Sequence, residues 1–157
     1  MRILRLLLIS AISLFLLITA ISLLIPSKVR ISRATNMYTT APAVWQQVDD
    51  MHNWKEWNPF FSDLPEGQIR FSDTAGAVPA SMEIDGLRVQ WKEKRSDERI
   101  AEMQKEGHRT ILNGWKCVNH PGTDSITVQW YLDFQLRWYP WEKFSSLLFE
   151  KSYGMRM

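Results

Sequence analysis

One uninterrupted apolar segment near the N-terminus constrains this 157-residue chain more than any other feature. Residues 6–25 read LLLISAISLFLLITAISLLI, without a charged side chain, and 14 of these 20 residues are Leu, Ile or Phe. As an α-helix the segment would be about 30 Å long, which matches the hydrocarbon core of a bilayer. On an insertion scale these three residue types contribute roughly −4 to −8 kcal/mol. The segment therefore predicts a single-pass membrane anchor within residues 1–27.

A cleaved signal peptide is the competing interpretation, because Arg2 and Arg5 supply the basic residues that precede such a segment. The apolar run exceeds the usual signal core of about 7–15 residues, and no A-x-A-like cleavage site follows it. An uncleaved anchor is therefore preferred. Lys28, Arg30 and Arg33 follow the segment, so basic residues flank both of its ends. The positive-inside rule therefore hardly favours either orientation in the membrane. The short N-terminal tail favours a domain outside the cytoplasm.

The charge balance of the rest of the chain argues against nucleic acid as a partner. Arg2 and Arg5 are the only charges before Lys28, so of 19 basic and 17 acidic residues, 17 of each lie in residues 28–157. A domain with a net charge of zero lacks the excess of positive charge that attracts nucleic acid. The short basic cluster at residues 28–33 abuts the apolar segment, and we expect it to meet lipid headgroups.

Motifs that would indicate catalysis or metal binding do not occur in the sequence. His52, His108 and His120 lack the spacing of metal ligands. Cys117 is the single cysteine, so an intrachain disulfide and a thiolate metal cluster are excluded. A nucleophile elbow, a P-loop and a dinucleotide-binding fingerprint are also missing from the sequence. We therefore expect no catalytic residue, no metal and no cofactor.

A strand followed by two short helices is predicted after the anchor. Residues 28–38 alternate apolar with polar side chains, as a strand does. Residues 40–51 place apolar side chains on one face of a helix, with Thr40 as a candidate N-cap. Asn53 and Glu56 resemble a capping box for a second, very short helix. Two tryptophans of that helix, three residues apart, would then point to the same side.

The second half of the chain consists of short alternating runs separated by turn residues, which predict about five antiparallel strands. The clearest strand is SITVQWYLDFQL at residues 125–136, where apolar side chains alternate with mostly polar ones. This alternation is typical of a sheet with one buried face. Residues 140–154 predict a final helix, with Phe144, Leu147 and Leu148 at helical spacing. The order of elements predicts an α+β domain.

Several of these stretches resemble a known family. APAVWQQVDDMHNWKEWNPF, residues 41–60, is similar to the segment after the first strand in START-related, SRPBCC-type proteins, often named polyketide cyclase/dehydrase and lipid-transport proteins. IPSKV, TDSITVQWYLDF and WYPWEKFSSLLFEKSYG fit the same pattern and resemble most a bacterial subgroup with an N-terminal membrane segment. The resemblance implies a helix-grip fold, in which a curved antiparallel sheet wraps a long C-terminal helix. Two short helices would close one end of a hydrophobic cavity.

The resemblance also implies that residues 28–157 bind a lipid or other hydrophobic small molecule without catalysis. Members of the family continue into a long helix beyond the point where this chain stops, so the C-terminal helix is expected to be incomplete. A polyketide cyclase/dehydrase-like enzyme and a ligand-sensing or interaction module at the membrane stay open as alternatives. The oligomeric state stays undetermined.

The residues expected to line the cavity are mostly apolar side chains of the predicted strands and short helices. Asn113 is in phase with Ile111 and Trp115 and is nominated as a polar group that could orient a ligand; a satisfied core amide explains it equally well. The complete set of cavity candidates is Trp45, Val48, Trp54, Trp57, Met82, Ile84, Val89, Trp91, Asn113, Trp115, Val128, Trp130 and Leu132.

Overall fold

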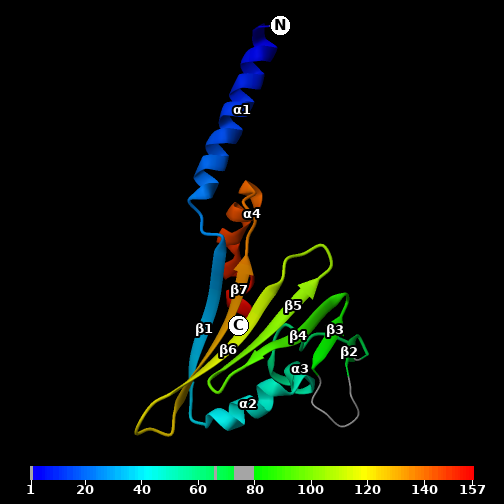
Figure 1. Ribbon diagram of the computed structural model, residues 1–157, viewed down its shortest axis with the longest axis vertical. Coiled ribbons are helices and arrows are strands. Elements are labelled where there is room, and N and C mark those ends of the chain that lie inside the picture. Colours follow the sequence, from blue (N-terminus) through cyan, green and yellow to red (C-terminus); the bar gives the residue numbers. More distant parts are fainter. Residues whose placement is uncertain (1, 66, 73–79) are drawn as a thin grey trace.

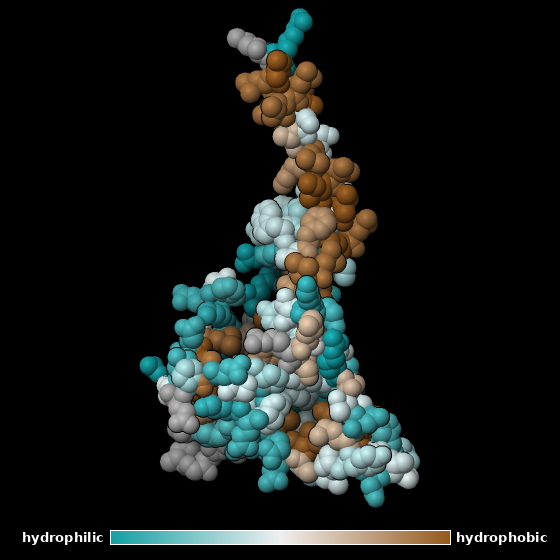
Figure 2. Space-filling model, turned by 180° about the vertical axis from the view of Figure 1, so that it is seen from behind, coloured by the Kyte–Doolittle hydropathy of each residue, from teal (hydrophilic) through white to brown (hydrophobic). Residues whose placement is uncertain are grey.

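The computed structural model describes residues 2–65, 67–72 and 80–157. A long helix extends away from one end of a domain built on a curved sheet (Figure 1). Helix α1, Arg2–Leu23, is the one helix in the described residues that is long and apolar enough to cross a membrane. Its apolar side chains are exposed along most of its length, and its hydrophobic surface projects from a largely hydrophilic domain (Figure 2). Only its last turns pack against the domain, where Ser22 is buried.

The described residues form one antiparallel sheet of seven strands in the order β1-β7-β6-β5-β4-β3-β2. From β2 to β7 each strand pairs with the next one in the chain, and β7 then pairs with β1. This arrangement confirms an α+β fold with an antiparallel sheet. The strands are β1 Lys28–Met37, β2 Ile69–Phe71, β3 Ser81–Ile84, β4 Leu87–Lys94, β5 Glu98–Lys105, β6 Ile111–Asn119 and β7 Ile126–Gln135.

The two faces of the sheet differ in chemistry because side chains alternate along each strand. The buried face, here called the inner face, carries a row of paired residues that crosses five strands: Ile31, Leu132, Asn113, Ala101 and Trp91. The residues adjacent to these in each strand face the opposite side. The outer face therefore carries a mostly charged and polar row: Arg30, Asp133, Leu112, Glu102 and Gln90.

Two short helices cover the inner face at the end remote from α1 (Figure 1). They are α2, Ala41–Asp49, and α3, Trp54–Trp57, joined by the 3-10 turn η1, Met51–Asn53. The predicted caps do not form in the described residues, since neither the Thr40 nor the Asn53 side chain makes a capping hydrogen bond. The chain turns earlier, where the Asp50 carboxylate accepts a hydrogen bond from the backbone N–H of His52.

The C-terminal segment differs from the single helix predicted over residues 140–154. It is broken into α4 Pro140–Ser145, η2 Ser146–Leu148, α5 Phe149–Ser152 and η3 Gly154–Arg156. The apolar side chains predicted to mark its packed face, Phe144, Leu147 and Leu148, are exposed. Lys143 is buried instead, together with Pro140 and Ser146, and its ammonium donates to the carbonyl of Ile25 at 2.7 Å and to Ser27 Oγ at 2.8 Å. These two bonds turn the polar side of α4 toward the end of α1.

Candidate functional site

A cluster of tryptophans fills the half of the inner face that lies under α2 and α3. Trp115 of β6 is at its centre, with ring centroids 5.0 Å from Trp54, 6.2 Å from Trp57, 6.0 Å from Trp91 and 6.3 Å from Trp130. Each well-oriented aromatic pair adds about 0.5–1.5 kcal/mol beyond the burial of apolar area. Trp54 and Trp57 of α3 both contact Trp115 at the centre of this cluster. This explains why the polar segment around α3 contains two tryptophans.

The structure brings the predicted cavity residues together on the inner face or on the helix above it. Trp45 of α2 lies at the edge of the cluster, where its indole donates to the carbonyl of Ser96 at 3.2 Å and the Arg99 guanidinium lies 4.4 Å from its ring centre. Leu132 belongs to a second apolar group nearer α1. Their role as a ligand wall stays a prediction. The others pack in or against the tryptophan cluster: Val48, Met82, Ile84, Val89 and Val128.

Asn113 has the environment of a core amide. Its side-chain carbonyl accepts a hydrogen bond of 2.6 Å from the Trp130 indole, and its amide nitrogen lies 3.9 Å from Met103 Sδ. Asn113 thereby holds one tryptophan in place from the neighbouring strand. A ligand oxygen would have to compete with Met103 for the amide N–H, and a thioether sulfur is only a weak acceptor.

Four buried nitrogen donors in this region have no hydrogen-bond partner among the described residues: Trp57 Nε1, Trp91 Nε1, Trp115 Nε1 and Asn58 Nδ2. A buried donor without an acceptor costs about 1–3 kcal/mol. Neighbouring ring faces can offer no more than weak N–H···π contacts. The cluster therefore combines apolar walls with unused donors, and an acceptor oxygen brought among these rings would relieve part of that cost.

A pocket of about 290 Å³ lies in the other half of the inner face, at the end nearest α1. Its floor is aromatic and aliphatic: the Phe134 ring lies 4.7 Å from Phe149 and 5.1 Å from Tyr153, and Ile111 is the cross-strand partner of Phe134. The sequence prediction missed this pocket. Ile111 and Phe134 are in phase with predicted wall residues, and Phe149 and Tyr153 have i, i+4 spacing, so the signal existed beside the stronger tryptophan pattern.

The mouth of this pocket is polar. His108, Arg109, Arg137 and Glu142 line it, and the first three are exposed. The Glu142 carboxylate accepts a hydrogen bond of 2.7 Å from the backbone N–H of Arg137, which fixes the start of α4. In the described part of the chain, carboxylates and cationic groups lie at the mouth of the pocket and not on its floor. The described residues also contain no group of three His, Cys, Asp or Glu that could hold a metal ion.

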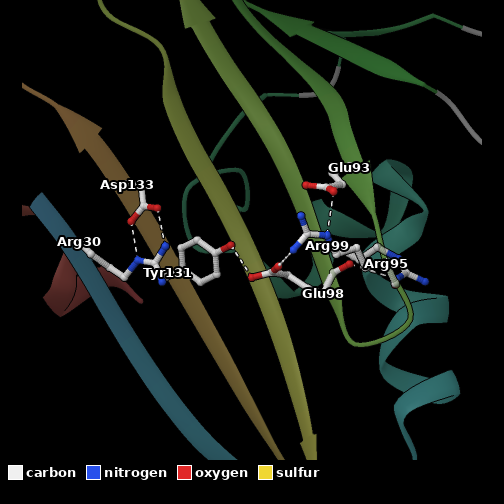
Figure 3. A network of polar contacts seen from close by, with 7 residues as sticks. All are labelled: Arg30, Glu93, Arg95, Glu98, Arg99, Tyr131 and Asp133. Carbon is white, nitrogen blue, oxygen red and sulfur yellow. Dashed lines mark hydrogen bonds and ion pairs between the residues drawn. The ribbon is translucent and has the colours of Figure 1, made fainter. Parts of the chain in front are cut away.

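A polar network crosses the outer face of the sheet (Figure 3). Arg30 donates two hydrogen bonds of 2.6 Å to Asp133, and its guanidinium lies 4.1 Å from the centre of the Tyr131 ring. The Tyr131 hydroxyl donates to Glu98 at 2.8 Å, and Arg95 pairs with the other oxygen of Glu98 at 3.3 Å. Burial and the bond to Glu98 raise the pKa of Tyr131 above its ordinary value. The phenol therefore stays neutral, and the network joins β1 to β7 by an ion pair and β7 to β5 by a hydrogen bond.

Comparison with known proteins establishes the class of fold. No family model and no curated protein matches the chain. A START superfamily protein from Mycobacterium smegmatis shares 14% identity over 81% of this chain and 92% of its own, with a TM-score of 0.54. The Zhui aromatase/cyclase from Streptomyces sp. R1128 shares 9% identity over 80% of this chain and 87% of its own, with a TM-score of 0.51.

A third similar structure is the di-domain ARO/CYC BexL from the BE-7585A biosynthetic pathway. It shares 11% identity over 83% of this chain and 47% of its own, with a TM-score of 0.53. At such identities the similarity shows the fold alone. The protein has a START-like α+β fold with a seven-stranded antiparallel sheet and an apolar N-terminal helix.

Proposed function

We propose that α1 anchors the protein in a membrane and that the domain captures a lipid or other hydrophobic small molecule on its inner face, without catalysis. The pocket of about 290 Å³ at the anchor end carries the proposal. It is already formed, its floor is apolar, and it opens beside the helix that would enter the bilayer. The START-like fold supports hydrophobic ligand binding in general terms.

The energetics suit reversible capture. An acyl chain that buries roughly 300 Å² of apolar area gains about 7 kcal/mol at 25 cal/mol per Å². Losses of translational and conformational freedom reduce this value. Arg109 and Arg137 at the mouth would attract a carboxylate or phosphate headgroup, while the chain lies over Phe134. Deeper on the inner face, the unpartnered indole donors would favour an oxygen-bearing ligand over a pure hydrocarbon.

The polyketide cyclase-like alternative lacks a supporting observation at this site. Two of the similar structures are named as aromatase/cyclases, but their similarity to this chain is one of fold. A cyclase needs an acid and a base that face its substrate. The described ionisable groups of the pocket lie at its mouth, and Glu142 is already held by a backbone N–H. A sensing or interaction role at the membrane is compatible with ligand capture and would act through it.

The proposal can be tested by adding 9,10-dibromostearate to the full chain in detergent and following tryptophan emission. The background should carry Trp138→Phe and Trp141→Phe, because both side chains are exposed and would be quenched from the micelle. We expect saturable quenching of the buried tryptophans in the micromolar range. Ile111→Asp, which places a charge on the pocket floor, should weaken binding at least tenfold. Ile111→Phe should also weaken it by filling the pocket.

Leu112→Asn is the control, since Leu112 neighbours Ile111 on β6 but faces the outer side of the sheet, and a neutral amide avoids repulsion from its cross-strand partners Asp133 and Glu102. This variant should bind as the parent does, with the same circular dichroism spectrum. Quenching that does not saturate, or that Ile111→Asp and Leu112→Asn reduce equally, would contradict capture on the inner face.

A further inference from the structure

Large apolar side chains are exposed where the chain leaves β7. Trp138 and Trp141 are 60% and 63% exposed, whereas the other six tryptophans are buried or half-buried. Tyr139 stacks on Trp141 with a centroid separation of 4.8 Å, and Leu147 and Leu148 are exposed beside them in the chain. We call these five residues the aromatic patch. Several large apolar side chains left exposed on one segment are typical of a contact surface, because their exposure to water is unfavourable.

The aromatic patch is fixed beside the end of α1. Lys143 of α4, which lies between Trp141 and Leu147 in the chain, donates to the carbonyl of Ile25 and to Ser27 Oγ. Ser22, in the last turn of α1, is fully buried where α4 contacts that helix. Figure 1 shows α4 level with the lower end of α1, and Figure 2 shows pale side chains of intermediate hydropathy flanking the lower end of the apolar helix. The patch and the anchor are thus held together by buried contacts.

The length of α1 defines where a membrane surface would lie. A helix of 22 residues is about 33 Å long, slightly more than the hydrocarbon thickness of a bilayer. If its N-terminal end, at Arg2, marks one interface, the other falls at its last turns, where α4 packs. Tryptophan and tyrosine are enriched at this depth because their rings are apolar and their N–H and O–H groups can reach water.

We propose that the aromatic patch lies in the headgroup region of the same bilayer that holds α1, and so seats the domain on the membrane with its pocket beside the lipid. This inference rests on the anchoring role of α1 proposed above. Arg137, whose guanidinium lies 5.9 Å from the Tyr139 ring centre, and Lys28 would meet anionic headgroups.

The seated arrangement gives the pocket a direct route to lipid. Helix α4 presents Trp141 to the outside, while Glu142 and Ser145 line the pocket. One short helix therefore separates the pocket from the membrane surface defined by the patch. A lipid could pass around α4 with little exposure of its chain to water, which would lower the cost of its transfer from the bilayer.

Depth-dependent quenching tests the inference. The full chain would be reconstituted into phosphatidylcholine vesicles containing lipids brominated either near the carbonyl end or near the methyl end of the acyl chain. We expect the shallow bromines to quench tryptophan emission several times more strongly than the deep ones. Trp138→Phe with Trp141→Phe should remove most of this quenching. Tyr38→Trp, at a position 95% exposed near α2, should add emission that neither lipid quenches.

Extraction with alkaline carbonate separates the two ideas. If the chain resists extraction but the shallow bromines quench no more than the deep ones, α1 is an anchor and the patch does not touch the membrane. If carbonate releases the chain, the anchor and the seated patch both fail. If quenching is absent and a cysteine introduced by Trp141→Cys forms an intermolecular disulfide in high yield, a second copy covers the patch, and the inference is overturned.

Discussion

At the scale of single residues, Cys117 shows how burial controls chemistry in this domain. Its side chain is 5% exposed on the inner face of β6. Burial raises the pKa of the Cys117 thiol to about 11. The thiolate is the reactive form, and with this pKa only about one thiol in a thousand is ionised at pH 8, so its reaction is slow. We expect the folded chain in detergent to resist a thiol-specific reagent and to react with one equivalent after unfolding. Rapid labelling of the folded chain would contradict this packing.

The same thiol predicts a pH dependence of stability. Because its pKa in the folded chain lies above the ordinary value of 9.0, the folded state holds the proton more tightly than the unfolded state does. Its contribution to stability is therefore complete below pH 9 and is lost as the pH rises toward 11. Cys117→Ala should show a smaller fall in melting temperature between pH 8 and pH 10.5 than the parent. The pKa of Tyr131 is also raised in the folded chain, but its effect on stability is the same in both proteins and cancels in the comparison.

Residue patterns predicted contacts well where one strong periodicity dominated. The three-residue spacing of Trp54 and Trp57 correctly placed both rings on one side, since both contact Trp115. Hydrogen bonds were predicted less well. The cap expected at Asn53 moved to Asp50, because a cap depends on the local path of the chain, and several residues nearby could supply the oxygen.

At the scale of elements, alternation was a sufficient signal for the strands, and the C-terminal helix was the main difference. Phe144, Leu147 and Leu148 have the spacing of a buried helix face, yet they are exposed. The reason is a buried cation: Lys143 finds acceptors in Ile25 and Ser27, which are more than 110 residues away in the chain. No local pattern indicates such a partner. The apolar face of the segment is then left exposed.

Lys143→Met tests whether this contact fixes the domain on the anchor. The substitution keeps the length of the side chain but leaves the Ile25 carbonyl without the ammonium donor. We expect a loss of about 1–3 kcal/mol in stability, and faster hydrogen exchange in α4 and at the start of β1. Lys151→Met is the control, because Lys151 is an exposed lysine of α5. Equal effects of the two substitutions would show that the Lys143 contact contributes nothing specific.

At the scale of the whole molecule, the pairing of β1 with β7 decides where the candidate site lies. β1 begins shortly after α1 and β7 ends shortly before α4, and their antiparallel register pairs Lys28 with Gln135. Both ends therefore meet at the base of α1, and the pocket above Phe134 opens there. The sequence predicted each strand but not this pocket. The position of the pocket depends on the pairing of β1 with β7, which are far apart in the sequence. Its volume depends on the break in the C-terminal helix, which the spacing of apolar residues does not indicate.

If α1 anchors the protein as proposed, the orientation of the molecule in the membrane is a further property of the whole molecule. The basic residues on the two sides of α1 nearly balance, so the short N-terminal tail is the deciding feature, and we expect Arg2 inside and the domain outside the cytoplasm. Tyr38→Cys and Arg2→Cys place a reactive thiol on opposite sides, while the native Cys117 is too buried to interfere. In right-side-out membrane vesicles, an impermeant maleimide should label Tyr38→Cys at once and Arg2→Cys only after detergent is added. The reverse pattern would place the pocket on the cytoplasmic side. Labelling of both variants would point to an N-terminal helix that does not span, and the proposal of a lipid site beside a transmembrane anchor would then lose its basis.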